Sequence, residues 1–331
     1  MRGDNGGFRK VIEAIIAEER VKRHEALAKK LEELLNATPV ERPVIKGGGS
    51  ILDQSVGNLF REVTPQRKLS DLILTDDARQ ICQSLIEERR RTDLLRSYNL
   101  EPRNRALLIG PPGNGKTSLA EAIADALEVP LLVVAYEGIV GAYLGETAVR
   151  LKKLFEHAST RKCVLFFDEF ETLGKERGDP HETGEIKRVV SSLLMRIDNL
   201  PSHVMVIGAT NHAELLDRAV WRRFQVRMTL PGPSGASLTE WFEKFERRIK
   251  IPLGYAPDAL AELFQGSNFA EVEEFGATVF RKYALEQANA NMKDIVSKTL
   301  RSWSARTVTV ARRNQSEEKE AETPATSFSN A

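Results

Sequence analysis

Short apolar runs alternate with longer helical patterns along the middle of the chain. The strand-like runs cover residues 106–109, 130–134, 164–167, 204–208 and 227–230. Segments whose apolar residues recur at helical spacing separate them. Another strand-like run, in KLSDLIL at 68–74, precedes a long helix that we expect to begin near Thr75 and Asp76. Strands alternating with helices predict an α/β fold, in which helices cover both faces of a parallel sheet.

Helical patterns without strands flank this α/β region. Residues 8–36 predict one long helix or a helical hairpin, either as a partner-binding arm or packed on its own body. Residues 37–50 contain two prolines and three glycines and predict a linker. We expect a helical arm at 1–36, a linker at 37–58, an α/β subdomain at 59–235, a small helical lid at 236–311 and a disordered polar tail at 312–331.

The composition of the chain narrows the classes of protein to which it can belong. The chain has 331 residues, of which 41% are hydrophobic, so more than one domain is expected. A net charge of +1 argues mildly against nucleic acid as a partner. No apolar stretch is long enough to predict a membrane span, and MRGDNGGFRK lacks the apolar core of a signal peptide. The two cysteines lack metal-ligand spacing, so we expect a reduced, cytoplasmic protein.

The stretch LLIGPPGNGKTSLAEAI, residues 107–123, joins a strand to a helix through glycines and a lysine. Its G-x-x-x-x-G-K-T spacing is that of a phosphate-binding loop. Glycines let backbone N–H groups surround anionic oxygens at the positive end of the helix. Lys116 can reach the β- and γ-phosphates, and the Thr117 hydroxyl can ligate Mg²⁺. The predicted binding residues are Gly110, Pro111, Pro112, Gly113, Asn114, Gly115, Lys116, Thr117 and Ser118.

Polar residues follow two further strands. The buried-type run 164–167 ends in Asp168 and Glu169, and a buried strand that ends in two carboxylates implies a cation or a water that needs them. We expect Asp168 to hold Mg²⁺ and Glu169 to act as the general base on the attacking water. Asn211 follows the run 204–208, so it is expected beside Asp168, where it orients that water or touches the γ-phosphate.

Two adjacent arginines, Arg222 and Arg223, lie between a short helix and the last strand. Adjacent arginines are usually surface charges. A phosphoryl-transfer site also needs positive charge beyond its lysine and metal, and an arginine finger from a neighbouring subunit can supply it. Both interpretations stay open on the residues alone.

These elements, in this order, resemble the protein-remodelling clade of the AAA ATPases over about residues 71–290. GPPGNGKT is similar to the Walker A motif, LFFDEFETLG to Walker B, GATN to sensor 1 and DRAVWRRF to the arginine-finger segment. The resemblance implies an ATP-hydrolysing ring, most often a hexamer. In such a ring Arg222 and Arg223 reach the ATP bound by the next subunit.

Three further segments resemble the family with departures from its pattern. Asp71 and Leu72 are placed like the adenine-pocket linker, whose glycine pair is missing here. Ala270 matches the alanine of sensor 2, although Phe269 replaces a common glycine. Tyr143 and Leu144 stand where the family grips a substrate polypeptide in its central pore, a role that suits aromatic and aliphatic side chains. A tyrosine buried at the start of a helix is the alternative.

The chain also resembles bacterial AAA ATPases encoded beside subtilisin-like serine proteases. This resemblance rests on three segments: the arm, LLRSYNLEPRNRALLIGPPGNGKTSLAEA and GKERGDPHETGEIKRVVSSLL. That resemblance implies a protease partner bound through the N-terminal helix. The chain itself has no G-x-S-x-G motif, so proteolysis would belong to another chain.

We therefore expect the protein to form an ATP- and Mg²⁺-dependent ring that remodels or unfolds polypeptides. We expect neither a membrane nor a nucleic acid among its partners. Two other classes remain: a nucleotide-switched DNA-associated loader or binding module, and a scaffold that binds ATP without hydrolysing it. Glu169 argues against the scaffold.

Overall fold

A computed structural model describes residues 58–135, 144–174, 183–286 and 290–303. The chain divides into two units, Met1–Gln54 and Ser55–Ala331, and every described residue belongs to the second. The expected arm at 1–36, the linker as far as residue 57, the tail at 312–331 and Tyr143 lie outside the described residues.

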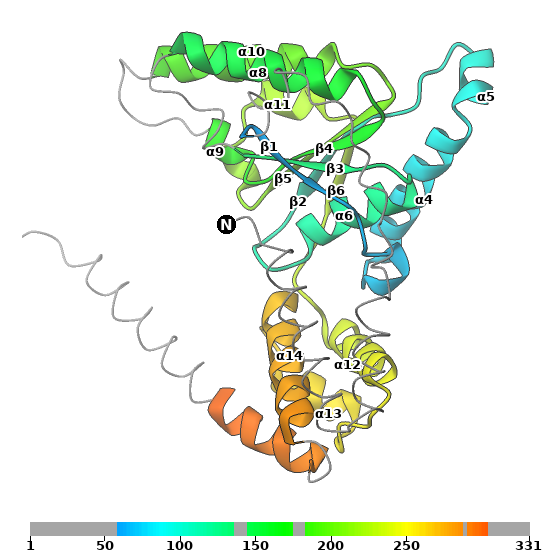
Figure 1. Cartoon of the computed structure of the whole chain (residues 1–331), viewed down its shortest axis with the longest axis vertical. Helices are drawn as coiled ribbons and strands as arrows, with labels where there is room; N and C mark the ends of the chain where they lie inside the picture. Colours follow the sequence, from blue (N-terminus) through cyan, green and yellow to red (C-terminus); the bar gives the residue numbers. More distant parts are fainter. Residues whose placement is uncertain (1–57, 136–143, 175–182, 287–289, 304–331) are drawn as a thin grey trace, which may run out of the picture. The chain divides into compact units, whose positions relative to one another are not determined.

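Six strands form one sheet in the order β1-β3-β4-β5-β2-β6 (Figure 1). All neighbours run parallel except β1, which pairs antiparallel with β3 at the sheet edge. The predicted parallel α/β sheet is thus confirmed. The strands are β1 (Phe60–Val63), β2 (Arg105–Ile109), β3 (Leu131–Val134), β4 (Cys163–Phe167), β5 (Val204–Thr210) and β6 (Val226–Thr229).

Before residue 75 one local prediction is wrong and one strand was not predicted. The strand-like run in KLSDLIL contains a 3-10 helix, η1 (Leu69–Asp71), because the Asp71 carboxylate accepts the Lys68 N–H at 3.1 Å and turns the chain. The strand that pairs with β3 lies earlier, at β1. Its sequence FREV carries two exposed polar residues at its centre, so no apolar run marked it.

Helices cover both faces of the sheet. The long helix begins as predicted: α4 (Asp76–Arg90) follows Thr75, whose hydroxyl accepts the Ala78 N–H at 3.3 Å. The chain then continues through α5 (Thr92–Ser97), α6 (Lys116–Ala126), α8 (Leu144–Ser159), α9 (Glu171–Gly174), α10 (Thr183–Asp198), η2 (Ala213–Leu215) and α11 (Arg218–Arg223).

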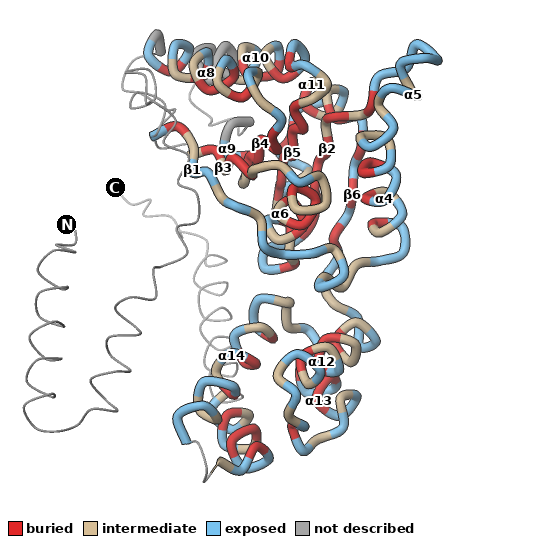
Figure 2. Tube along the Cα trace, turned by 45° about the vertical axis from the view of Figure 1, so that its right-hand side comes forward, coloured by how far each residue is buried: buried red, intermediate tan, exposed pale blue. Residues whose placement is uncertain are grey.

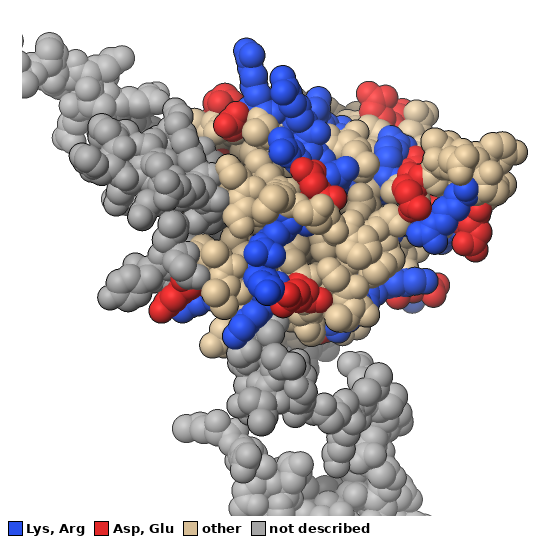
Figure 3. All heavy atoms as spheres, turned by 90° about the horizontal axis from the view of Figure 1, so that it is seen from above, with Lys and Arg blue, Asp and Glu red and all other residues tan. Residues whose placement is uncertain are grey.

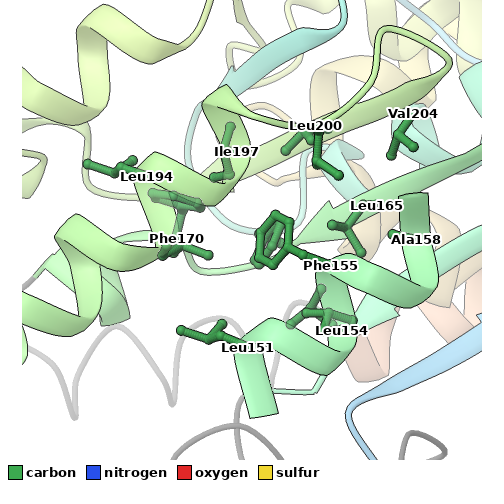
Figure 4. Close-up of a cluster of buried hydrophobic side chains, with 14 of the residues drawn as sticks. Leu151, Leu154, Phe155, Ala158, Leu165, Phe170, Leu194, Ile197, Leu200 and Val204 are labelled. Atoms are coloured by element: carbon green, nitrogen blue, oxygen red, sulfur yellow. The ribbon is translucent and has the colours of Figure 1, made fainter. Parts of the chain in front are cut away.

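The sheet separates two apolar cores (Figure 2). Because side chains alternate along a strand, Val164 and Phe166 of β4 pack with α4 and α6. Leu165 and Phe167 of the same strand pack with α8, α10 and α11 on the opposite face. Figure 4 shows part of this second core, where Phe155 and Ile197 lie among leucines. A strand buried on both faces explains the continuous apolar runs of the sequence.

The helices after residue 234 have a core of their own. They are α12 (Gly235–Ile249), α13 (Pro257–Leu263) and α14 (Phe269–Glu286), followed by helical residues 292–303. Their buried side chains include Phe242, Phe264 and Phe275, whose rings contact one another. We call this part the lid. None of the helices in the described part of the chain is long and apolar enough to cross a membrane.

Candidate active site

The loop between β2 and α6 needs its glycines. Gly113 and Gly115 have positive φ angles of 77° and 84°, in the left-handed region that other residues avoid. A Cβ on Gly110 would lie 2.1 Å from the Leu230 carbonyl oxygen, which leaves no room for a side chain. Gly115 caps α6, so the loop leads directly into the N-terminus of that helix. This geometry is the predicted anion-binding loop.

Lys116, the first residue of α6, is almost completely buried. Its Nζ donates to the carbonyl oxygens of Gly110 at 2.7 Å and Pro111 at 2.9 Å, and to Asn211 Oδ1 at 2.6 Å. Burial lowers the pKa of this ammonium from its ordinary value, and the carboxylates of Asp168 and Glu171 offset part of that effect. The loop before α6 and Asn211, which follows β5, therefore both contact the ammonium group of Lys116.

The carboxylates expected after β4 lie beside the same loop. Asp168 Oδ2 accepts the Thr117 hydroxyl at 3.1 Å, and Asp168 Oδ1 accepts the Glu169 N–H at 3.0 Å. Glu169 has a φ angle of 46°, a left-handed conformation that is uncommon for a residue with a side chain. This turn ends β4 and lets Phe170 N–H donate to the Ala209 carbonyl of β5 at 2.8 Å.

Glu171 is a site residue that the sequence analysis missed. Its Oε1 accepts the Asn211 N–H at 3.2 Å, while its buried Oε2 has no hydrogen-bond partner among the described residues. Only 7% of Glu171 is exposed. A third carboxylate three residues after Asp168 was a usable signal, but solvated acids are common at the start of a helix.

A cavity of about 1110 Å³ opens beside these groups. Thr117, Ser118, Asp168, Glu169 and Asn211 line it, as do the loop residues Pro112, Gly113, Asn114, Gly115 and Lys116. Gly110 and Pro111 are absent from this lining and instead hold the Lys116 ammonium. The structure thus brings together the residues that the sequence predicted from three separate strand ends.

The lid and the segment before α4 also line the cavity. Asp71 and Leu72 contribute to it, as predicted from the linker resemblance. Ala270 contributes as well, and its N–H donates to the Gly113 carbonyl at 3.0 Å. Trp241 and Lys244 of α12 were not predicted. On an amphipathic helix an aromatic residue is ordinarily part of the core and a lysine part of the surface. The sequence therefore held no signal that these two residues line a binding cavity.

Arg222 and Arg223 are not among the residues that line the cavity. Arg222 is exposed at the end of α11. Arg223 Nε donates to Asp198 Oδ2 at 3.1 Å, and Asp198 also pairs with Arg105. Arg223 is therefore held by Asp198 of its own chain, Arg222 is exposed, and neither side chain lines the cavity. Leu144 begins α8, but its side chain lies outside the described part.

Comparison with known proteins agrees with this geometry. Residues 106–232 match the family model described as the ATPase family associated with various cellular activities, AAA. The chain is 34% identical over 289 residues to an uncharacterised AAA family ATPase of Sinorhizobium fredii, covering 86% of this chain and 87% of the relative.

Two archaeal relatives are more distant. A 26S proteasome regulatory subunit homolog of Methanothermobacter marburgensis is 30% identical over 244 residues, covering 73% of this chain and 65% of that protein. A proteasome-activating nucleotidase of Saccharolobus islandicus is 27% identical over 286 residues, covering 79% and 73%. With the phosphate-binding loop, the paired carboxylates and the asparagine around one cavity, these similarities show that the chain belongs to the AAA family of ATPases.

Proposed function

We propose that the protein is a ring-forming remodeller that uses ATP hydrolysis to unfold polypeptides and thread them through a central pore. The observation that carries the ATP-driven part is that Lys116, Asp168, Glu169 and Asn211 line one cavity together. The polypeptide substrate and the hexameric ring are supported by relatives named as a proteasome regulatory subunit homolog and a proteasome-activating nucleotidase.

In this proposal the phosphates of ATP lie in the loop before α6. Lys116 exchanges part of its contacts with Gly110 and Pro111 for the β- and γ-phosphates. Glu169 accepts a proton from the attacking water, and Asn211 orients that water or the γ-phosphate. Glu171 acts behind them, because its carboxylate fixes the backbone of Asn211.

The donor set suits Mg²⁺. The Thr117 hydroxyl and the Asp168 carboxylate supply oxygen atoms 3.1 Å apart at the edge of the cavity, and oxygen is the ligand that this hard cation prefers. When bound, Mg²⁺ would neutralise phosphate charge. Thr117 and Asp168 are the residues we assign to hold it.

Two further parts of the proposal concern partners. We propose that the segment 1–36 binds a subtilisin-like serine protease, which degrades the unfolded product. We place both proteins in the cytoplasm, where the buried, free thiols of Cys82 and Cys163 would stay reduced. Deleting residues 1–36 should abolish copurification of the protease and preserve polypeptide-stimulated ATPase activity. Copurification that survives the deletion would refute the assignment to the arm.

The polypeptide substrate is tested by comparing ATP turnover with an unfolded protein, with DNA and with neither. We expect the unfolded protein to stimulate turnover. On the face seen in Figure 3, basic side chains are interspersed with acidic ones, which does not favour a uniformly basic nucleic-acid surface there. Stimulation by DNA alone would replace the remodeller with a DNA-associated loader.

Tyr143→Ala should leave basal ATPase activity within about twofold of the parent and abolish unfolding of a folded reporter, because Tyr143 grips substrate in the proposal rather than nucleotide. The measurement is reporter fluorescence beside phosphate release. Tyr98→Ala is the matched control, since Tyr98 is 72% exposed after α5. Loss of both activities would identify Tyr143 as a packed residue, and retention of both would remove it from the pore.

Glu171→Ala should lower kcat about tenfold with little change in the Kd for ATP, because Asn211 loses the acceptor of its backbone N–H while the phosphate-binding loop stays intact. Glu171→Gln keeps a carbonyl oxygen at that position and should retain most of the activity. Steady-state kinetics with direct binding measurements separate kcat from affinity. An equal loss in both variants would mean that the charge of Glu171, rather than its hydrogen bond, matters.

A further inference from the structure

Lys244 of the lid lines the cavity together with Ser70, Asp71 and Leu72. Its Nζ donates to the carbonyl oxygens of Ser70 at 3.2 Å and Leu72 at 3.3 Å. The third contact is Glu240 Oε1 at 3.0 Å, one helical turn earlier on α12. A lysine ammonium has three N–H donors, so these three acceptors match its full capacity.

The segment that Lys244 contacts belongs to two packing environments. Leu72 and Leu74 pack against the core of the sheet, whereas Ile73, between them, packs against the core of the lid. The segment is turned by η1, in which the Leu72 N–H donates to the Leu69 carbonyl at 3.3 Å. Lys244 therefore ties a tight backbone turn to the lid helix at the point where the chain passes between the two cores.

Aromatic side chains stand on either side of Lys244. Trp241 and Phe245, three residues before and one residue after it, line the same cavity, and their rings stack at 5.0 Å with an interplanar angle of 11°. The Arg248 guanidinium lies 5.2 Å from the centre of the Phe245 ring. Apolar rings and backbone polar groups suit a flat heteroaromatic base, whereas the phosphate-binding loop carries the groups for phosphate.

We propose that Lys244 is a positioning residue for the purine base of the nucleotide. It holds the Ser70–Leu72 turn against α12 through its hydrogen bonds to the Ser70 and Leu72 carbonyl oxygens. The inference rests on the proposed function, in which the phosphates of ATP bind at Lys116. It adds that base recognition depends on a contact supplied by the lid.

The test compares ligands that share the triphosphate but differ in the base. Lys244→Met preserves the length of the side chain and removes its donors. We expect the Kd for ATP to rise about tenfold, the loss typical of charge-assisted hydrogen bonds, and the Kd for inorganic tripolyphosphate to change less than about twofold. The ratio of kcat/KM for ATP to that for CTP should fall, and Lys244→Arg, which keeps donors, should restore part of it.

Lys298→Met is the matched control, because Lys298 is an exposed lysine on another lid helix. If ATP and tripolyphosphate weaken together, or if the ratio of ATP to CTP stays constant while both rates fall, Lys244 is a structural residue and the proposal is wrong. An unchanged ATP affinity also overturns it. Failure of the proposed function would be seen separately, because Lys116→Ala would then bind ATP as tightly as the parent protein does.

Discussion

Glu169→Gln is expected to bind ATP with near-normal affinity and to hydrolyse it at least about 100-fold more slowly, the loss typical of a missing general base. The amide keeps the size of the carboxylate but cannot accept a proton. Because Glu169 is held by the turn between β4 and α9, and Phe170 N–H fixes that turn to β5, the substitution should leave the loop before α6 undisturbed. Single-turnover phosphate release and equilibrium ATP binding measure the two effects.

The control is Glu274→Gln, which makes the same chemical change at an exposed position of the lid. Lys116→Ala provides the contrast, because it removes a charge from the phosphates and should weaken ATP binding itself. Near-normal turnover in Glu169→Gln would show that another group accepts the proton. Unchanged ATP affinity in Lys116→Ala would count against the phosphate site.

Mixing two inactive proteins should restore ATPase activity if the arginines act between subunits. One protein is Lys116→Ala, and the other carries Arg222→Ala with Arg223→Ala. The double substitution alone should lower turnover on the order of 10³-fold, the lower end of the range for arginine fingers, whereas each single substitution should cost less. In mixed rings, some interfaces pair an intact phosphate-binding loop with intact arginines of the neighbour, so activity should reappear and depend on total protein concentration.

The structure gives the two arginines different starting positions. Arg223 must leave or share Asp198 to reach a neighbouring nucleotide, whereas Arg222 is already exposed. We therefore expect Arg222→Ala to lower turnover more than Arg223→Ala. Arg218→Ala, on the same helix α11 and also exposed, is the matched control. If mixed rings form and activity does not return, the arginines are surface or interface charges.

The sequence predicted the central sheet well because β2 to β5 are largely apolar runs bounded by polar turns, and β6 alternates the buried Val226 and Met228 with exposed residues. Each element that the sequence missed has an identifiable physical cause. β1 is held by backbone pairing to β3 and has exposed side chains at its centre. Its strand character therefore depends on a distant partner, as in the pair Glu62 and Leu132, which are 70 positions apart, rather than on its own pattern. The turn at Leu69 is held by short-range hydrogen bonds, among them the one that the Lys68 N–H donates to the Asp71 carboxylate, and apolar periodicity cannot predict such bonds.

In the site, too, the residues that follow a local sequence pattern were predicted and those that depend on tertiary contacts were not. Glycine spacing and strand-end carboxylates predicted the loop and the residues at Asp168, Glu169 and Asn211, because parallel strands bring their carboxyl ends to one edge. Glu171 and Lys244 act by accepting or donating to backbone groups of other segments, Asn211 in one case and Ser70 and Leu72 in the other. Such contacts depend on tertiary placement, which a single sequence does not encode in any local pattern.

The strand order has a consequence for synthesis on the ribosome. Among the strands in the described part of the chain, β2, which leads into the phosphate-binding loop, is the second to be translated, yet it lies between β5 and β6, the last two. A nascent chain that ends before residue 204 therefore lacks both neighbours of β2, and the loop has no Asn211 to receive Lys116. Long-range pairing of this kind forms late in folding. The nucleotide-binding site is therefore complete only after most of the α/β part has been made. Until then β2 is an apolar segment without its neighbouring strands, and something other than those strands must keep it from aggregating.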